Sequence, residues 1–266
     1  MFTRWVEARQ LAADLLVHFS KGTDAANRAV MADTDEASSA FAREAGEEAQ
    51  AVDAGLDRLE ALLRDLHYSD ELGLTAELRK EFAKYRALDH EILGLAVENT
   101  NLKAQRLCFG PAAEAADALR DALAWATSHV PARESDWHAR ALATSALLAV
   151  REIQVLQAPH IAAADDATMT ELERQMATLE ASARSALRDL AGTSGPERRA
   201  SIDAANAALD RFMGIHAQVI ALSRRNSNVR SLALSLGQKR DLAAECESTL
   251  RALADRLAQH EFTGTR

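Results

Sequence analysis

Two polar stretches that repeat along the chain carry the residues best suited to ligand chemistry. They lie in the segments Tyr85–Leu123 and Phe212–Leu250, which align without a gap at an offset of 127 residues. The alignment matches two asparagines and a basic residue, which the packing of repeated helices does not by itself require. The equivalent polar pairs are Asn99 with Asn226, Asn101 with Asn228, and Lys103 with Arg230.

In each segment the first of the two matched asparagines, Asn99 or Asn226, falls on the apolar stripe of a predicted helix. Steps of seven residues join Tyr85, Ile92, Asn99 and Arg106 in the first segment, and they reach Asn226 in the second. A core amide without a hydrogen-bond partner costs about 1–3 kcal/mol. Two interpretations stay open: an asparagine that sets the register of a helical bundle, or an amide that binds a ligand in a polar cavity.

Basic residues extend this candidate site. Arg106 lies on the same stripe, where a guanidinium group needs a carboxylate, a bound anion or a route to solvent. Arg151 lies among apolar residues of a later helix, which indicates a salt bridge or an anion contact. Lys103 and Arg230 flank the stripe, either as ligand contacts or as part of a solvated face. The predicted ligand-binding residues are Asn99, Lys103, Arg106, Arg151, Asn226 and Arg230.

Motifs that indicate catalysis or a bound cofactor are absent from the sequence. It holds no Glu-x-x-His of a di-iron bundle, no His-Glu-x-x-His zinc motif, no haem-attachment motif and no glycine-rich phosphate loop. The eight histidines show no metal-ligand spacing. We therefore expect a non-catalytic protein that needs neither metal nor cofactor.

Composition and charge narrow the class of protein further. Alanine dominates, glycine and proline are sparse, and the net charge is -9, so we expect helices and no nucleic-acid partner. The sequence contains no run of about 18 apolar residues, so we expect no membrane span within it. The first residues also lack the apolar core of a signal peptide. These features leave a cytoplasmic protein or the soluble part of a larger membrane protein.

Breaker residues divide the chain into six predicted helices. The seam of Val52, Leu56, Leu59, Leu63 and Leu66 follows the heptad spacing of a packed helix. Turns are expected at Gly110-Pro111, at 129–133 and at Gly237. Pro159 is expected to kink or break its helix. The predicted ranges are about 3–67 (with an interruption at 32–36 that Asp33 or Thr34 would cap), 75–109, 111–129, 134–190, 197–236 and 238–260.

Helix lengths then suggest a topology. At about 1.5 Å per residue, the helices at 3–67 and 134–190 would be long rods, and the other four would be shorter. The predicted fold is all-α and elongated, with two stacked four-helix bundles that share the two long helices. One module would comprise about residues 36–158, and the other would comprise 1–35 with 159–266.

Three stretches resemble the extracytoplasmic helical sensor domains of bacterial chemoreceptors and sensor kinases. They are NRAVMADTDEASSAFA at 27–42, LAVENTNLKAQRLCFGP at 95–111 and REIQVLQAPHI at 151–161. The helical bimodular kind, with two bundles that share two long helices, is most similar in length and helix order. The resemblance implies a periplasmic, dimer-forming domain that binds organic acids between helices. It assigns Arg106 and Arg151 to ligand carboxylates and places flanking membrane spans outside this chain.

Two functional hypotheses follow. The first is the sensor domain of a bacterial transmembrane receptor for chemotaxis or two-component signalling, which binds a small anionic molecule. It would be periplasmic or extracellular, and it would form a homodimer through the long helices with its 1–35 and 159–266 module nearer the membrane. The second is a cytoplasmic helical scaffold that binds only protein partners.

Overall fold

The computed structural model describes residues 2–128 and 134–260, and every regular element within them is helical. The predicted all-α class is confirmed. The helix end expected near His129–Arg133 lies outside the described residues. The helices are α1 (Phe2–Met31), α2 (Asp35–Leu66), α3 (Ser69–Glu98), α4 (Thr100–Leu107), α5 (Ala113–Ser128), α6 (Glu134–Ala162), α7 (Asp166–Thr193), α8 (Pro196–Arg225), α9 (Ser227–Leu234) and α10 (Arg240–Gln259). Single π-helical turns, η1 (Cys108–Ala112) and η2 (Ser235–Lys239), join α4 to α5 and α9 to α10.

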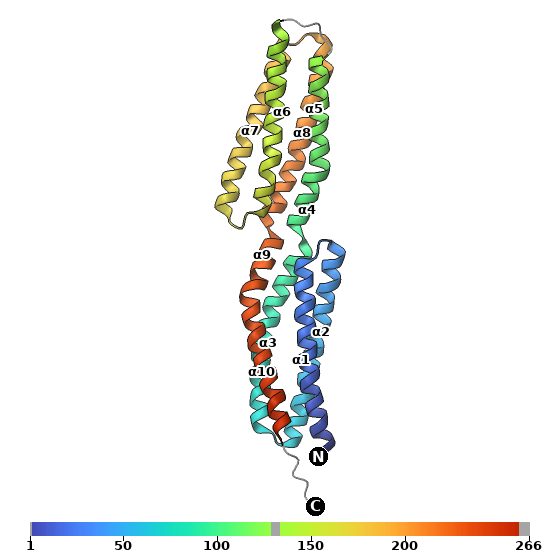
Figure 1. Cartoon of the computed structure of the whole chain (residues 1–266), viewed down its shortest axis with the longest axis vertical. Helices are drawn as coiled ribbons and strands as arrows, with labels where there is room; N and C mark the ends of the chain where they lie inside the picture. Colours follow the sequence, from blue (N-terminus) through green and yellow to red (C-terminus); the bar gives the residue numbers. More distant parts are fainter. Residues whose placement is uncertain (1, 129–133, 261–266) are drawn as a thin grey trace, which may run out of the picture. The chain divides into compact units, whose positions relative to one another are not determined.

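Helix packing divides the chain into two compact units. Unit 1 comprises Met1–Asn99 and Arg230–Arg266, and unit 2 comprises Thr100–Val229. In unit 1, α1, α2, α3 and α10 form a four-helix bundle around a leucine-rich core (Figure 1). In unit 2, α5, α6, α7 and α8 do the same around a core rich in alanine. The predicted seam from Val52 to Leu66 lies in the unit 1 core.

The two segments expected to be long rods are helical hairpins. α2 packs back along α1, and α7 packs back along α6 (Figure 1). Thr34 caps α2 by accepting a hydrogen bond from the Ala37 amide at 3.1 Å, and Asp165 caps α7 from the Thr168 amide at 2.8 Å. These caps satisfy amides that have no partner inside the helix, so a new helix begins in a new direction. The cap at Thr34 is confirmed, but continuous helices over 3–67 and 134–190 are wrong.

The expected break at Pro159 is displaced along the chain. α6 continues through the proline to Ala162, and the hairpin turn follows at residues 163–165. Proline removes the hydrogen bond that would reach the carbonyl of Val155. Val155 is 72% exposed, so its carbonyl lies on the side of α6 where solvent can supply the missing hydrogen bond. The helix therefore tolerates the proline.

The chain passes through Gly110-Pro111 and through Gly237 without the expected turns. Each glycine lies in a π-helical turn, η1 or η2, and the following helix continues from it. A π turn has one more residue in each hydrogen-bonded ring than an α-helix, so it accommodates a residue that cannot make the α-helical hydrogen bond. Pro111 lacks an amide hydrogen, and Gly237 has non-helical angles of φ −95° and ψ −109°.

The duplication extends beyond the segments found in the sequence. Both halves of the chain have the same order of elements: a hairpin, a helix that ends at an asparagine, a short helix, a π turn and a final helix. Unit 1 contains α1–α3 from the first repeat and α10 from the second, and unit 2 contains α6–α8 from the second and α5 from the first. This division differs from the expected 36–158 and 1–35 with 159–266, because each hairpin keeps both its arms in one unit.

Candidate functional site

The duplicated asparagines end helices. Asn99 follows α3 with φ 50° and ψ 38°, and Asn226 follows α8 with φ 53° and ψ 37°. Asparagine tolerates this left-handed conformation better than most residues, because its side chain forms local hydrogen bonds. The helical stripe does not continue through such a break, so the next residues in the heptad lines, Arg106 and Ala233, are exposed. The expected position of Arg106 on the core seam is wrong for this reason.

Directly after these breaks, the first residues of α4 and α9 cap each other's helices. The Thr100 amide donates to Ser227 Oγ at 3.1 Å, and the Ser227 amide donates to Thr100 Oγ1 at 3.0 Å. The amides of Asn101 and Asn228 donate to each other's Oδ1 atoms, both at 3.1 Å. Amides at helix starts lack partners inside their own helix. The repeated polar residues therefore form a reciprocal cap.

Asn226 fastens this cap to the α6–α7 turn. Its Oδ1 accepts a hydrogen bond from Asn101 Nδ2 at 2.7 Å, and its Nδ2 donates to the Ala163 carbonyl at 2.9 Å. Asn101 Nδ2 also donates to the Ile161 carbonyl at 2.7 Å. Both amide groups are buried and their hydrogen bonds stay within the protein. These hydrogen bonds give Asn226 a structural role, and its predicted ligand contact stays a prediction.

The predicted basic residues differ in their surroundings. Arg106 and Arg230 are exposed, and Lys103 is half-buried. Arg151 donates to Asp117 Oδ1 at 2.7 Å and to Gln154 Oε1 at 2.8 Å, which is the salt bridge that the sequence left open. The Arg151 hydrogen bond is also the main cause of the lowered pKa of Asp117.

Unit 1 contains a buried lysine, Lys239, that was not predicted from the sequence. Lys239, at the end of η2, is 1% exposed, and its Nζ is 2.7 Å from Asp89 Oδ1 on α3. The two groups form a buried ion pair. The ring of Tyr85 lies 5.7 Å from Nζ, and burial raises the pKa of its hydroxyl, with a contribution from Asp89. The signal was present, since Lys239 lies one heptad before the buried Cys246.

Lys239 lines a cleft of about 330 Å³ between α1 and the α9–η2–α10 segment, which we name the η2 cleft. Its walls are mostly apolar, and none of the residues that line it is acidic. Arg240 stands at its rim with its side chain 77% exposed. Asn27 lines the opposite wall, and its Oδ1 accepts a hydrogen bond from Ser235 at 3.3 Å. The lining residues are Thr23, Asn27, Val30, Met31, Leu232, Ser235, Leu236, Lys239, Arg240 and Ala243.

Unit 2 contains an equivalent cleft of about 500 Å³ between η1 and α6, which we name the η1 cleft. Within the repeated segments 85–123 and 212–250, four positions line both clefts at the offset of 127. The residues differ, because Ala112 and Ala113 stand where the η2 cleft has Lys239 and Arg240. The shared positions are Gln105 and Leu232, Cys108 and Ser235, Phe109 and Leu236, and Ala113 and Arg240.

A buried polar network in unit 2 resembles a catalytic triad but lacks its geometry. His160 is fully buried, with Nδ1 2.8 Å from Ser223 Oγ and Nε2 2.9 Å from Glu173 Oε1. Ser223 donates its hydroxyl proton to the His160 carbonyl at 3.0 Å, so His160 Nδ1 must be the donor to Ser223. Hydrogen bonds from Arg224 are the main cause of the lowered pKa of Glu173. Ser223 is itself fully buried, and the network ties α6, α7 and α8 together.

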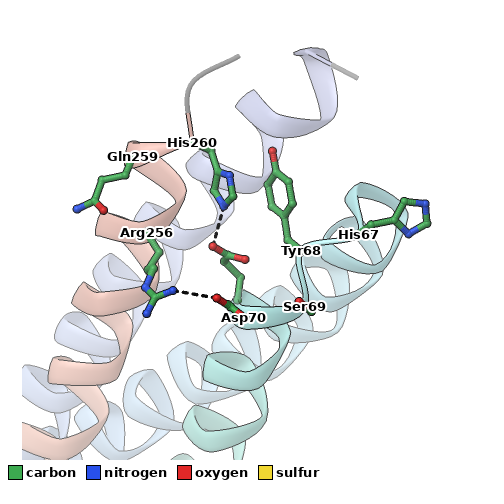
Figure 2. Close-up of a pocket in the computed structure, with 8 residues that line it drawn as sticks. His67, Tyr68, Ser69, Asp70, Arg256, Gln259 and His260 are labelled. Carbon is green, nitrogen blue, oxygen red and sulfur yellow. Dashed lines mark hydrogen bonds and ion pairs between the residues drawn. The ribbon is translucent and has the colours of Figure 1, made fainter. Parts of the chain in front are cut away.

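A polar hollow at one end of unit 1 holds the last turn of α10 against the α2–α3 turn (Figure 2). His260 Nε2 is 2.7 Å from Glu71 Oε1, and Arg256 is 3.2 Å from Asp70. The ring of His260 stacks on Tyr68 at 4.0 Å. Both acids already have cationic or imidazole partners, so we assign the hollow to the docking of α10.

Comparisons with protein-family models, with curated proteins and with solved structures give no match for this chain. Within residues 2–128 and 134–260, no group of three or more potential metal ligands lies together. In the same residues, no helix is both long and apolar enough to cross a bilayer.

Proposed function

We propose that this chain is a non-catalytic sensor domain of a bacterial transmembrane receptor that binds a small anionic molecule in the η2 cleft. The observation that carries the proposal is the buried Lys239 in the wall of a cleft that no acidic residue lines. Most binding pockets combine apolar walls with a few placed polar groups. The η2 cleft has this composition.

The cleft chemistry favours a carboxylate with an apolar body. Arg240 and the Asn27 amide are donors at the opening, and Lys239 lies deeper. Asp89 offsets the charge of Lys239. Arg240 is the exposed cation at the rim, and its 3.8 Å contact with the exposed Asp241 is loose enough for a ligand carboxylate to replace. Met31 and Leu236 are 71% and 64% exposed at the rim, where an aliphatic or aromatic body would cover them.

The course of α10 links the cleft to the ends of the domain. α10 begins at the cleft and extends for 20 residues, about 30 Å, to the end of unit 1 where α1 begins (Figure 1). There the Trp5 indole donates to the Leu257 carbonyl at 3.1 Å. A ligand that changes the packing of η2 against α1 would shift α10 relative to α1. A receptor with flanking membrane spans and a homodimeric arrangement, as the family resemblance implies, would transmit this shift.

Pairs of ligands that differ only in charge provide the test. We expect benzoate and butyrate to raise the unfolding temperature, and benzamide and butyramide to leave it unchanged. A ligand at about 100 times its dissociation constant stabilises the folded state by about 2.7 kcal/mol. Isothermal titration calorimetry would then give the affinity.

Variants distinguish the cleft from general charge effects. Arg240→Gln should weaken acid binding by about tenfold or more, because a hydrogen bond to a charged group is lost. Arg251→Gln, a matched exposed arginine on α10 outside the cleft, should not change the affinity. The double variant Lys239→Met with Asp89→Leu keeps the core neutral and should weaken acid binding, because the Lys239 ammonium group is lost from the cleft wall while Arg240 remains. Failure of every acid to bind the folded protein would contradict the proposal and favour the scaffold hypothesis.

A further inference from the structure

We infer that the η1 cleft of unit 2 is a second binding site, for an uncharged ligand with an aromatic or aliphatic body and one N–H or O–H donor. This inference goes beyond the proposed anion site, because it concerns a different cleft and a different class of ligand.

The size and walls of the η1 cleft fit a small organic molecule. Its volume of about 500 Å³ lies in the range of ligand pockets. Phe109 and Val155 line it and are 77% and 72% exposed, which leaves two large apolar side chains in water. Cys108 and Ile161 are buried beside them. An apolar ligand body in the cleft would remove these surfaces from water.

The residues that line the η1 cleft offer no unpaired counter-ion, so they favour an uncharged ligand over a charged one. Its only lining cation is Arg151, whose guanidinium group is paired with Asp117 at 2.7 Å, and no acidic residue lines it. Ala112 and Ala113 replace the two cations of the η2 cleft. Burial raises the pKa of Cys108 to about 11, so its thiol is neutral as well. A charged ligand would lose its hydration without gaining a counter-ion.

A buried amide specifies the polar group of the ligand. Gln157 lines the cleft and is 1% exposed, and its Nε2 lies 3.0 Å from His216 Nδ1. Within the part of the chain that the structure describes, no residue donates a hydrogen bond to its amide oxygen. A few placed polar groups fix the orientation of a ligand in a mostly apolar pocket, so a ligand that supplies an N–H or O–H to this oxygen is favoured over one that lacks it. Gln154 already accepts from Arg151 and Gln105 is exposed, which leaves Gln157 as the buried polar anchor.

Indole, which is uncharged and has one N–H, is a suitable probe for the full chain. We expect calorimetry to detect indole binding and to show about tenfold weaker binding of benzofuran, which lacks the N–H. Indole should also slow the alkylation of Cys108 by iodoacetamide, measured by mass spectrometry. Cys246, which is 0% exposed in unit 1, is the internal control.

Variants at exposed positions test the site without disturbing the fold. Phe109→Ala and Val155→Ala should each weaken indole binding by about tenfold, as expected when an apolar anchor is truncated. Leu236→Ala changes the equivalent position of the η2 cleft and should leave indole binding unchanged. Absence of indole binding, equal affinity for benzofuran, or loss of binding in Leu236→Ala would each overturn the inference. Because benzoate binding is measured separately, either site can fail while the other is retained.

Discussion

The left-handed conformation of Asn226 predicts an unusual order of stabilities for two substitutions. At most helical positions alanine is more stable than glycine by about 1 kcal/mol. At φ 53° the order should reverse, because the Cβ of alanine costs about 1–2 kcal/mol in this conformation and glycine has no such cost. Asn226→Ala should therefore be less stable than Asn226→Gly.

Both substitutions also remove the side-chain hydrogen bonds of Asn226. The Ala163 carbonyl loses its donor, while Asn101 Nδ2 keeps the Ile161 carbonyl as a second acceptor. One part-buried carbonyl is thus left without its donor, at a cost of about 1 kcal/mol. We expect Asn226→Gly to be destabilised by about that amount, and Asn226→Ala by about 1–2 kcal/mol more.

Urea unfolding followed by circular dichroism measures these differences. Asn206 is the matched control, because it lies inside α8 of the same unit and its side chain makes one hydrogen bond, to the Ile202 carbonyl. There glycine should be less stable than alanine. The same order of glycine and alanine at both positions would refute the assignment of Asn226 as a conformational residue.

Three further predictions concern buried charges and thiols. Lys239→Met should destabilise unit 1 by about 3–5 kcal/mol in thermal unfolding, because it leaves Asp89 charged and unpaired. Adding Asp89→Leu should recover most of this loss. A double variant that is no more stable than Lys239→Met would contradict the pairing. Because the folded pKa of Glu173 is lowered from 4.5, its stabilising contribution is complete above that value and is lost as the pH falls through the folded pKa. Urea titrations should therefore show a difference between the wild type and Glu173→Gln that narrows in acid, and a constant difference would count against this linkage. Cys108 should react with Ellman's reagent before Cys246, because burial raises the pKa of Cys108 to about 11 and that of Cys246 to about 12. Faster labelling of Cys246 would contradict this prediction.

Local features of the fold could be predicted from the sequence because neighbouring residues determine them. Val52, Leu56 and Leu63 recur at heptad spacing, and all three are buried in the core. Thr34 precedes two acidic residues, and it caps α2 as expected. Both signals depend on the helical period and on the helix ends, which span only a few residues.

The direction of the chain after each break could not be predicted in the same way. The cap at Thr34 predicts where a helix begins, but it does not predict whether the chain reverses its direction there. Gly110-Pro111 carries the signal of a turn, and the chain instead continues through a π turn. These choices depend on which apolar faces meet once the helices pack, and a local window of sequence does not contain that information.

The amino-acid sequence by itself determined that the chain is helical, that it is duplicated and that polar residues interrupt its stripes at matched positions. Only the tertiary structure decided what those residues do. Asn226 has partners from two other segments, and Lys239 is paired with Asp89, which lies 150 positions earlier in the chain. The two clefts also depend on side chains from helices distant in sequence, because a pocket exists only where packed surfaces fail to fill the space between them.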